Sequence, residues 1–303
     1  MNKLQKIGPL FVIVAAFLWA LDGIVLRPEL YSLSVPLVVF VEHALAFLIM
    51  TPLLLYEIKE LKKMKKGDWG AFLWVAIFGG AIGTMFITKA LFYVHFVNLS
   101  IVILLQKLQP VFALLLAAFI LKEKLPKKFF YYAVAAIIGG YLVTFGLNQP
   151  EFSTGNKTFI AALFALGAAF AFGSATVFGK RGLQNINFRV GTYLRFGLTT
   201  LVMFFITAAV GDLSTINQIT QRQLITFLII VFSSGGLAIF LYYYGLKWIT
   251  ASVSTICELA FPLSAILLEF LIRGNALSLA QWAGAALMIY AMYKVSKVQA
   301  KLE

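Results

Sequence analysis

Residues 15–20 read AAFLWA, and residues 168–173 read AAFAFG, 153 positions later. Two prolines repeat at nearly the same offset, because Pro262 follows Pro110 by 152 positions. The first half of the chain therefore returns in the second half. Every segment that carries this repeat is apolar, so the repeat and the hydrophobicity have to be explained together.

The composition indicates a protein that lies in a membrane. Of 303 residues, 61% are hydrophobic and 12% are charged, which is outside the range of soluble proteins. Ten stretches are long enough to cross about 30 Å of hydrocarbon as helices. Continuous apolar runs exclude the alternating pattern of a membrane barrel. The predicted spans are 8–26, 33–55, 70–92, 98–121, 128–147, 157–178, 190–210, 224–244, 249–271 and 279–294.

The repeat divides these spans into two groups of five, over residues 1–148 and 156–303. Because five is odd, the second copy enters the bilayer upside down relative to the first. A polar linker at 148–156, NQPEFSTGN, is typical of a solvated loop between them. We therefore predict an all-α integral membrane fold of ten transmembrane helices, arranged as two inverted five-helix repeats in one domain. Such repeats are typical of secondary transporters, whose site lies near the bilayer midplane.

The net charge of +13 follows the predicted topology. If both termini are cytoplasmic, the inner flanks hold 18 Lys and Arg residues and the outer flanks hold four. This positive-inside bias predicts a multi-pass protein of the cell membrane with both termini in the cytoplasm. The basic residues then contact anionic lipid head groups, and a nucleic-acid partner is not expected.

Metal and cofactor chemistry have little support in the sequence. The single cysteine, Cys257, falls inside a predicted span, and the two histidines, His43 and His95, are far apart. Neither a GxGxxG nor a Walker motif is present. We expect no cofactor, no metal and no enzymatic activity, and we expect transport driven by gradients or exchange, with protons or a counter-substrate as candidate partners.

Four spans carry charged residues well inside the predicted hydrocarbon. These are Glu42, Lys107, Arg195 and Glu258, and His43 adjoins the first. A charge at the bilayer centre costs about 2.5–3.5 kcal/mol on insertion scales, so each needs a partner or a wet cavity. Two interpretations are open: the ion pairs Glu42–Lys107 and Arg195–Glu258 that only hold helices together, or a central site with both signs of charge.

The fourth and ninth spans carry the strongest local argument for a site. Gln106 and Glu258 are related by the repeat, and each precedes a proline by four residues. Proline cannot donate its backbone hydrogen bond, so it frees the carbonyl at these two positions. Freed carbonyls at this depth are tolerated where they line a cavity or meet a neighbour. Thr255 lies on the same helical face as Glu258, at a spacing of three. A simple kink is the alternative.

Aromatic residues add two further candidates. Trp19 lies past the middle of the first span, where it either stacks on a substrate or packs against neighbouring helices. Tyr242, Tyr243 and Tyr244 point in three directions on a helix, so at most two of them face a cavity. We take Tyr243 as the candidate substrate contact.

The chain resembles the drug/metabolite transporter superfamily, specifically its EamA-type branch with two five-helix repeats. The resemblance covers nearly the whole chain and rests on the paired first spans, on QKLQP at 106–110 against ELAFP at 258–262, and on YYYGLK at 242–247. It implies that the first four spans of each repeat line a central cavity. An Arg in the second span is kept only as Arg195, since the first copy has Glu42-His43 there. Substrates vary widely in this family.

Together these patterns predict a secondary transporter, an exporter or exchanger, of a small polar metabolite. Mixed internal charge favours an amino acid or a derivative, moved by alternating access. The alternatives are an integral membrane enzyme, which needs a nucleophile or acid–base pair at a membrane face, and a channel or receptor, which favours rings of like charge. The sequence leaves the oligomeric state open.

Overall fold

A computed structural model describes residues 3–93, 105–149, 156–274 and 277–299. Every regular element in these ranges is helical. The predicted fourth span starts within 94–104, and that start, with His95, lies outside the described residues.

The first half of the chain holds four of the candidate spans and one shorter helix. Its elements are α1 (Lys3–Leu21), the short helices η1 (Asp22–Leu26) and η2 (Arg27–Leu30), α2 (Val35–Leu54), η3 (Leu55–Lys63), α3 (Lys66–Trp74), η4 (Val75–Ile82), α4 (Gly83–Tyr93), α6 (Gln109–Ile120) and α7 (Lys127–Phe145).

The second half repeats this order. Its elements are α8 (Asn156–Gly182), α9 (Phe188–Ala209), η5 (Asp212–Gln218), α10 (Gln221–Phe232), α11 (Gly236–Trp248), α12 (Ala251–Cys257), α13 (Ala260–Arg273) and α14 (Leu279–Gln299).

Eight helical stretches in the described part are long and apolar enough to span a membrane, which makes this a multi-pass membrane protein. Three of the eight contain an interruption: α3–η4–α4, α10–α11 and α12–α13. The helix α6 is apolar but shorter, at 12 residues. The sequence predicts ten spans, and the described residues show eight stretches of sufficient length.

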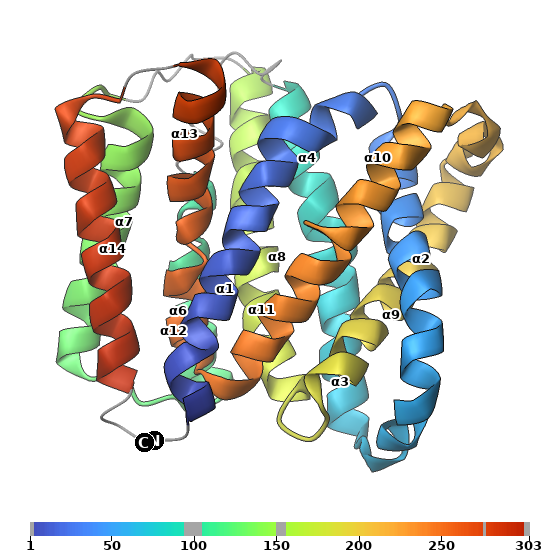
Figure 1. Cartoon of the computed structure of the whole chain (residues 1–303), viewed down its shortest axis with the longest axis horizontal. Coiled ribbons are helices and arrows are strands. Elements are labelled where there is room, and N and C mark those ends of the chain that lie inside the picture. The colour runs from blue at the N-terminus through green and yellow to red at the C-terminus, as the bar shows by residue number, and fades with distance from the viewer. Residues whose placement is uncertain (1–2, 94–104, 150–155, 275–276, 300–303) are drawn as a thin grey trace.

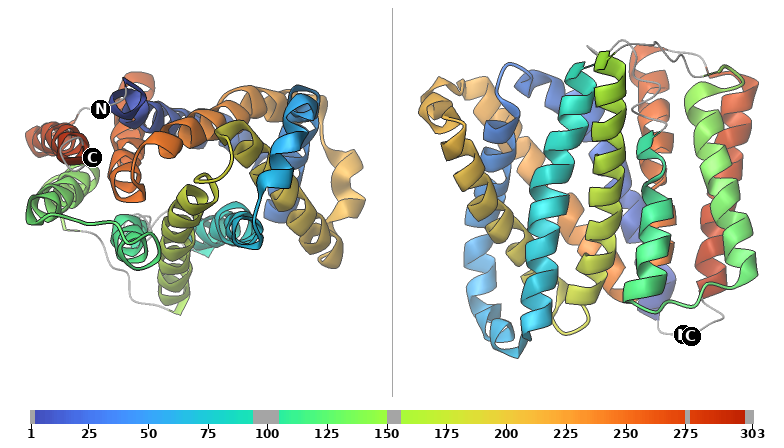
Figure 2. Two further views of the ribbon diagram at one scale, coloured as in Figure 1. Left: turned by 90° about the horizontal axis from the view of Figure 1, so that it is seen from below. Right: turned by 180° about the vertical axis from the view of Figure 1, so that it is seen from behind.

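Helices from the two halves pack against each other in reciprocal pairs. Helix α2 packs on α9 and α7 on α14, so two of these contacts join corresponding helices. The contact of α1 with α11 is matched by that of α8 with α4, and the contact of α1 with α13 by that of α8 with α6 (Figure 1). The pair α7 and α14 stands together at one side of the bundle (Figure 2). The bundle is thus built across the two halves.

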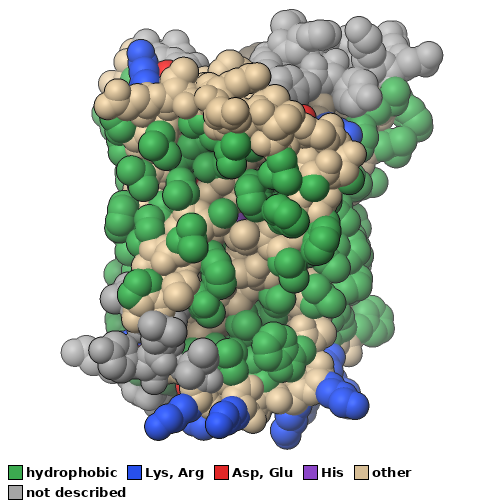
Figure 3. Space-filling view, turned by 90° about the vertical axis from the view of Figure 1, so that its right-hand side faces the viewer, with side chains coloured by type: hydrophobic (Ala, Val, Ile, Leu, Met, Phe, Trp, Pro, Cys, Tyr) green, Lys and Arg blue, Asp and Glu red, His purple; other side chains and the backbone are tan. Residues whose placement is uncertain are grey.

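The outer surface is what a bilayer requires. Figure 3 shows hydrophobic side chains over the middle of one face, with Lys and Arg gathered at the end where α1 begins and α14 ends. Leu115, Phe119 and Phe205 are among the exposed apolar residues, at 55%, 79% and 64%. Contact of such apolar side chains with lipid tails has no free-energy cost, whereas their contact with water is unfavourable.

The third helix of each half is interrupted at a corresponding place. In the first half the interruption is the π-helix η4, which contains Gly79 and Gly80. In the second half the chain breaks between α10 and α11, where the Gly235 N–H donates to the Ile230 carbonyl at 2.7 Å. This bond also spans five residues, as in a π-helix. Both breaks lie inside spans, where backbone irregularity is tolerated only within the protein.

Candidate functional site

Glu258 lies at a break in a membrane helix. Helix α12 ends at Cys257 and α13 begins at Ala260, since Pro262 has no N–H to continue the ladder. The carbonyl of Glu258 instead accepts the Phe261 N–H at 3.0 Å, one residue early. The corresponding segment of the first half also turns, at 107–108, ahead of Pro110 in α6. The predicted breaks in both helices are confirmed.

The carboxylate of Glu258 accepts hydrogen bonds from four side chains on four helices. Oε2 accepts from Nε2 of Gln109 at 2.8 Å. Oε1 accepts from the hydroxyls of Tyr242 at 3.0 Å, Thr176 at 3.2 Å and Ser254 at 3.2 Å. These donors come from α6, α11, α8 and the same α12, so helices of both halves meet at one carboxylate.

All four donors are neutral, and within the described ranges no Lys, Arg or His lies within 4.0 Å of this carboxylate. Thr176, Tyr242 and Ser254 are buried, yet Glu258 remains partly exposed among them. An ionised carboxylate has about four lone-pair positions and binds further donors strongly. Glu258 can therefore serve as a hydrogen-bond acceptor for a ligand.

Trp19 lies against Tyr242, one of the donors to this carboxylate. Its ring lies 5.3 Å from the ring of Tyr242, centroid to centroid, and the planes are tilted by 54°. Trp19 is partly exposed, while Tyr242 is buried. An acceptor next to a partly exposed indole suits a flat aromatic ligand with polar edges.

Gln106 and Lys107 precede Gln109 but do not bind Glu258. Lys107 is buried, and its Cδ lies 3.8 Å from the place that a Cβ on Gly140 would take. Lys107 thus turns toward α7, and Met288 of α14 lies on the same side. The structure places Gln109, which sequence reasoning passed over, at the carboxylate instead of Gln106.

Thr255 and Tyr243 lie close to this group without joining its hydrogen bonds. Both are fully buried, and neither hydroxyl has a partner among the described residues. The guanidinium of Arg195 lies over the Tyr243 ring, 5.7 Å from its centroid. Tyr242, the neighbour of the predicted residue, is the tyrosine that bonds to Glu258.

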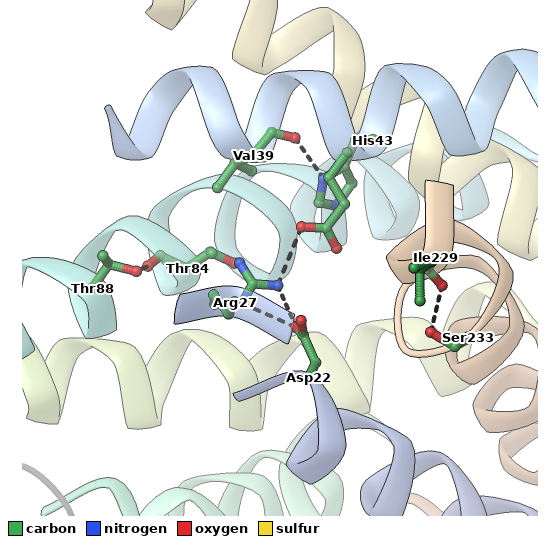
Figure 4. Close-up of polar contacts among 9 residues, drawn as sticks. Asp22, Arg27, Val39, His43, Thr84, Thr88, Ile229 and Ser233 are labelled. Atoms are coloured by element: carbon green, nitrogen blue, oxygen red, sulfur yellow. Dashed lines mark hydrogen bonds and ion pairs between the residues drawn. The ribbon is translucent and has the colours of Figure 1, made fainter. Parts of the chain in front are cut away.

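A second buried acidic group lies between the end of α1 and α2 (Figure 4). Arg27 donates to Oδ2 of Asp22 from Nε at 3.0 Å and from Nη2 at 2.5 Å. Nη2 also donates to Oε2 of Glu42 at 3.2 Å. Beside them, Nδ1 of His43 lies 2.8 Å from the carbonyl of Val39, so the ring is held by its own helix.

The two ion pairs considered from the sequence are therefore wrong for the described residues. Glu42 pairs with Arg27 and not with Lys107, and Glu258 is held by neutral donors and not by Arg195. The short helices η1 and η2 return Arg27 onto α2, although the sequence alone places Arg27 on an outer flank. Asp22 begins η1 and Arg27 follows its last residue, and this spacing was the sequence signal that could have indicated their pairing.

Comparison with known proteins gives consistent matches. The EamA-like transporter family matches residues 6–145 and 159–296. The chain is 47% identical to the riboflavin transporter ImpX of Fusobacterium nucleatum over 292 residues, covering 96% of this chain and 98% of that one. It is 27% identical to the uncharacterized transporter YwfM of Bacillus subtilis, over 98% and 96% of the two chains. A crystal structure at 17% identity matches 98% of both chains with a TM-score of 0.73, which shows the fold.

Proposed function

Since the chain belongs to the EamA-like transporter family, we propose that it carries riboflavin, or a close flavin, across the membrane. Membership makes it a transporter of the drug/metabolite superfamily. The identity of its cargo is the proposal, and so are alternating access and the residues that hold the cargo.

The main support for this cargo is a pair of contacts: Gln109 bonds to Glu258 at 2.8 Å, and Trp19 lies against Tyr242, which also bonds to Glu258. The isoalloxazine ring of a flavin is flat and aromatic, and one edge presents a ring N–H between two carbonyls. Glu258 accepts the N–H. The second amide hydrogen of Gln109, not used on Glu258, donates to an adjacent carbonyl. Trp19 stacks on the ring face. The relative at 47% identity, named as a riboflavin transporter, supports this cargo.

An amino acid remains the second candidate, because Glu258 and Arg195 place opposite charges near the same pair of tyrosines. Glu258 would then hold the ammonium group and Arg195 the carboxylate. The first proposal is favoured by the partly exposed indole of Trp19, which an amino acid with a small side chain leaves uncovered.

The architecture supports alternating access by two inverted repeats, which we place at 1–148 and 156–303. Helices α1 and α8 run in opposite directions in Figure 1, and the packing between the halves is reciprocal. Rocking of the halves about the Glu258 region would expose it to each side in turn. Export or exchange driven by the cargo gradient, protons or a counter-substrate fits a sequence without an ATP-binding motif.

The orientation can be tested by cysteine labelling. With both termini cytoplasmic, cysteines placed at Lys63, Lys127 and Lys297 react only with reagent supplied from the inside. A cysteine at Asn156 reacts only from outside. External labelling at position 63 would reverse the orientation.

The cargo is tested by counterflow in proteoliposomes. Vesicles loaded with unlabelled riboflavin should accumulate labelled riboflavin transiently and with saturation, and an excess of mixed amino acids should not compete. Empty vesicles and vesicles with an unrelated membrane protein are the controls. Amino-acid counterflow without riboflavin counterflow would replace the first candidate by the second. Counterflow of neither would leave the flavin proposal without support.

A further inference from the structure

Arg195 is a cation inside a membrane helix that forms no ion pair with another described residue. It lies in α9, and within the described ranges no carboxylate approaches it within 4.0 Å. Its Nε is buried and has no hydrogen-bond partner among the described residues. The hydroxyl of Tyr243, over whose ring the guanidinium lies at 5.7 Å, is also buried and forms no hydrogen bond with the part of the chain that the structure describes.

Three other cations near or inside the spans have oxygen partners. Arg27 bonds to two carboxylates. Lys180 donates to the carbonyls of Leu246 and Lys247 at 3.0 and 2.9 Å. Lys247 in turn donates to the Ile186 carbonyl at 2.9 Å. Arg195 differs from these, and leaving a buried charge and a buried hydroxyl without partners is costly unless a ligand supplies them.

Arg195 is less buried than its neighbours. Arg195 is partly exposed, although Tyr243 and Gly79 next to it are buried. Gly79 belongs to the π-helix η4 and has no side chain to cover the guanidinium; a Cβ there would lie 3.9 Å from Nη2. Gly79 therefore brings the break in the third helix of the first half next to Arg195.

Arg195 also lies next to the Glu258 group. The rings of Tyr243 and Tyr242 are 5.7 Å apart, and the Tyr242 hydroxyl bonds to Glu258 at 3.0 Å. The adjacent residues Tyr242 and Tyr243 thus lie between a hydrogen-bond acceptor, Glu258, and a cation, Arg195. This arrangement suits a ligand that carries an N–H edge and, at a distance, an anionic group.

We propose that Arg195 and Tyr243 form a second subsite of the cargo site, which binds a phosphate group, so that the protein carries flavin mononucleotide as well as riboflavin. The choice of a flavin rests on the proposed function; the phosphate subsite rests on Arg195 and Tyr243 alone. A guanidinium binds phosphate oxygens through two parallel N–H bonds, and the tyrosine hydroxyl adds a third donor.

The test compares riboflavin, flavin mononucleotide and inorganic phosphate on the purified full-length protein. Binding of the two flavins is measured by quenching of their fluorescence, and millimolar phosphate is tested by thermal stabilisation. Wild type should bind flavin mononucleotide about tenfold or more tightly than riboflavin. Arg195→Gln should remove this difference while riboflavin affinity stays unchanged, which also shows that the variant folds. Inorganic phosphate should stabilise wild type and not Arg195→Gln.

Two further variants make the result specific. Tyr243→Phe removes only an unpartnered hydroxyl, so it should fold and should weaken flavin mononucleotide several-fold without affecting riboflavin. Arg189→Gln, a matched change at the exposed start of the same helix, should change neither flavin. Equal affinities of the two flavins in wild type, or equal losses in Arg195→Gln, would overturn the subsite. If riboflavin does not bind at all, the cargo proposal fails, and thermal stabilisation by inorganic phosphate alone tests the subsite. If phosphate stabilises both wild type and Arg195→Gln, or neither of them, the phosphate subsite is rejected.

Discussion

Glu258 and Glu42 are both acidic residues inside membrane helices, but their partners differ in kind. Glu42 shares Arg27 with Asp22, so three charged groups form one cluster at the end of α1. Glu258 accepts from four neutral donors and has no cation within ion-pair distance in the described part of the chain. Both carboxylates are held in place, but only Glu42 has a cation as a partner.

The difference separates a structural charge from a ligand-binding one. Arg27 offsets one of the two negative charges of this cluster, so a ligand that displaced Arg27 would have to replace its bonds to both carboxylates. Neutral donors fix the position of Glu258 and leave its charge for an incoming N–H or cation. We therefore infer that the Glu42 cluster stabilises the fold and that Glu258 binds the cargo. Substitutions in each of these two groups test the difference between them.

The largest effect is expected from Arg27→Gln. It leaves the carboxylates of Asp22 and Glu42 facing each other without a cation, so the protein should lose about 3–5 kcal/mol of stability. Thermal melting in detergent measures this loss. A triple variant that adds Asp22→Asn and Glu42→Gln should recover most of it.

The matched control is Arg222→Gln, which breaks the exposed pair with Glu29 at 2.8 Å. Exposed pairs contribute about 0–1 kcal/mol, so its melting temperature should be close to that of wild type. Equal melting of Arg27→Gln and Arg222→Gln would show that the cluster is not structural.

A smaller effect, confined to binding, is expected from Gln109→Ala. This change removes the donor to Oε2 of Glu258 and the amide assigned to a flavin carbonyl, so riboflavin affinity should fall about tenfold. Gln106→Ala is the control, because Gln106 is the repeat partner of Glu258 by sequence but makes no contact with it. If Gln106→Ala has the larger effect, the sequence correspondence is a better guide than the geometry.

The smallest effect is expected from Tyr242→Phe. Thr176, Ser254 and Gln109 still hold the carboxylate, so only one hydrogen bond is lost and riboflavin affinity should fall a few-fold. Tyr244→Phe serves as the control, measured by the same fluorescence titration. A complete loss in Tyr242→Phe would show that Tyr242 contacts the cargo directly.

Much of the fold could be predicted from the sequence, because the signals were local. The apolar runs predict most of the spans, and the prolines at 110 and 262 predict the two helix breaks. The resemblance to EamA-type transporters is confirmed by matches over 6–145 and 159–296. The position of Glu258 at one of these breaks followed from its spacing to Pro262 alone.

The partners of Glu258 and Glu42 could not be predicted in the same way. Whether Tyr242 or Tyr243 faces Glu258 depends on the rotation of α11, and a π-type bond at Gly235 shifts the helical register just before it. Arg27 reaches Glu42 only because η1 and η2 fold the chain back onto α2. These are tertiary and irregular features, which hydrophobic periodicity does not encode.

The central assignment is tested most directly by riboflavin counterflow with Glu258→Gln and Glu42→Gln, each corrected for the amount of folded protein. Both substitutions remove one negative charge inside a membrane helix and keep the volume. We expect Glu258→Gln to lose about 100-fold in riboflavin counterflow yet to melt near wild type. Glu42→Gln should melt at a lower temperature and carry riboflavin normally per folded molecule. Normal counterflow in Glu258→Gln, or its loss in a well-folded Glu42→Gln protein, would contradict the assignment.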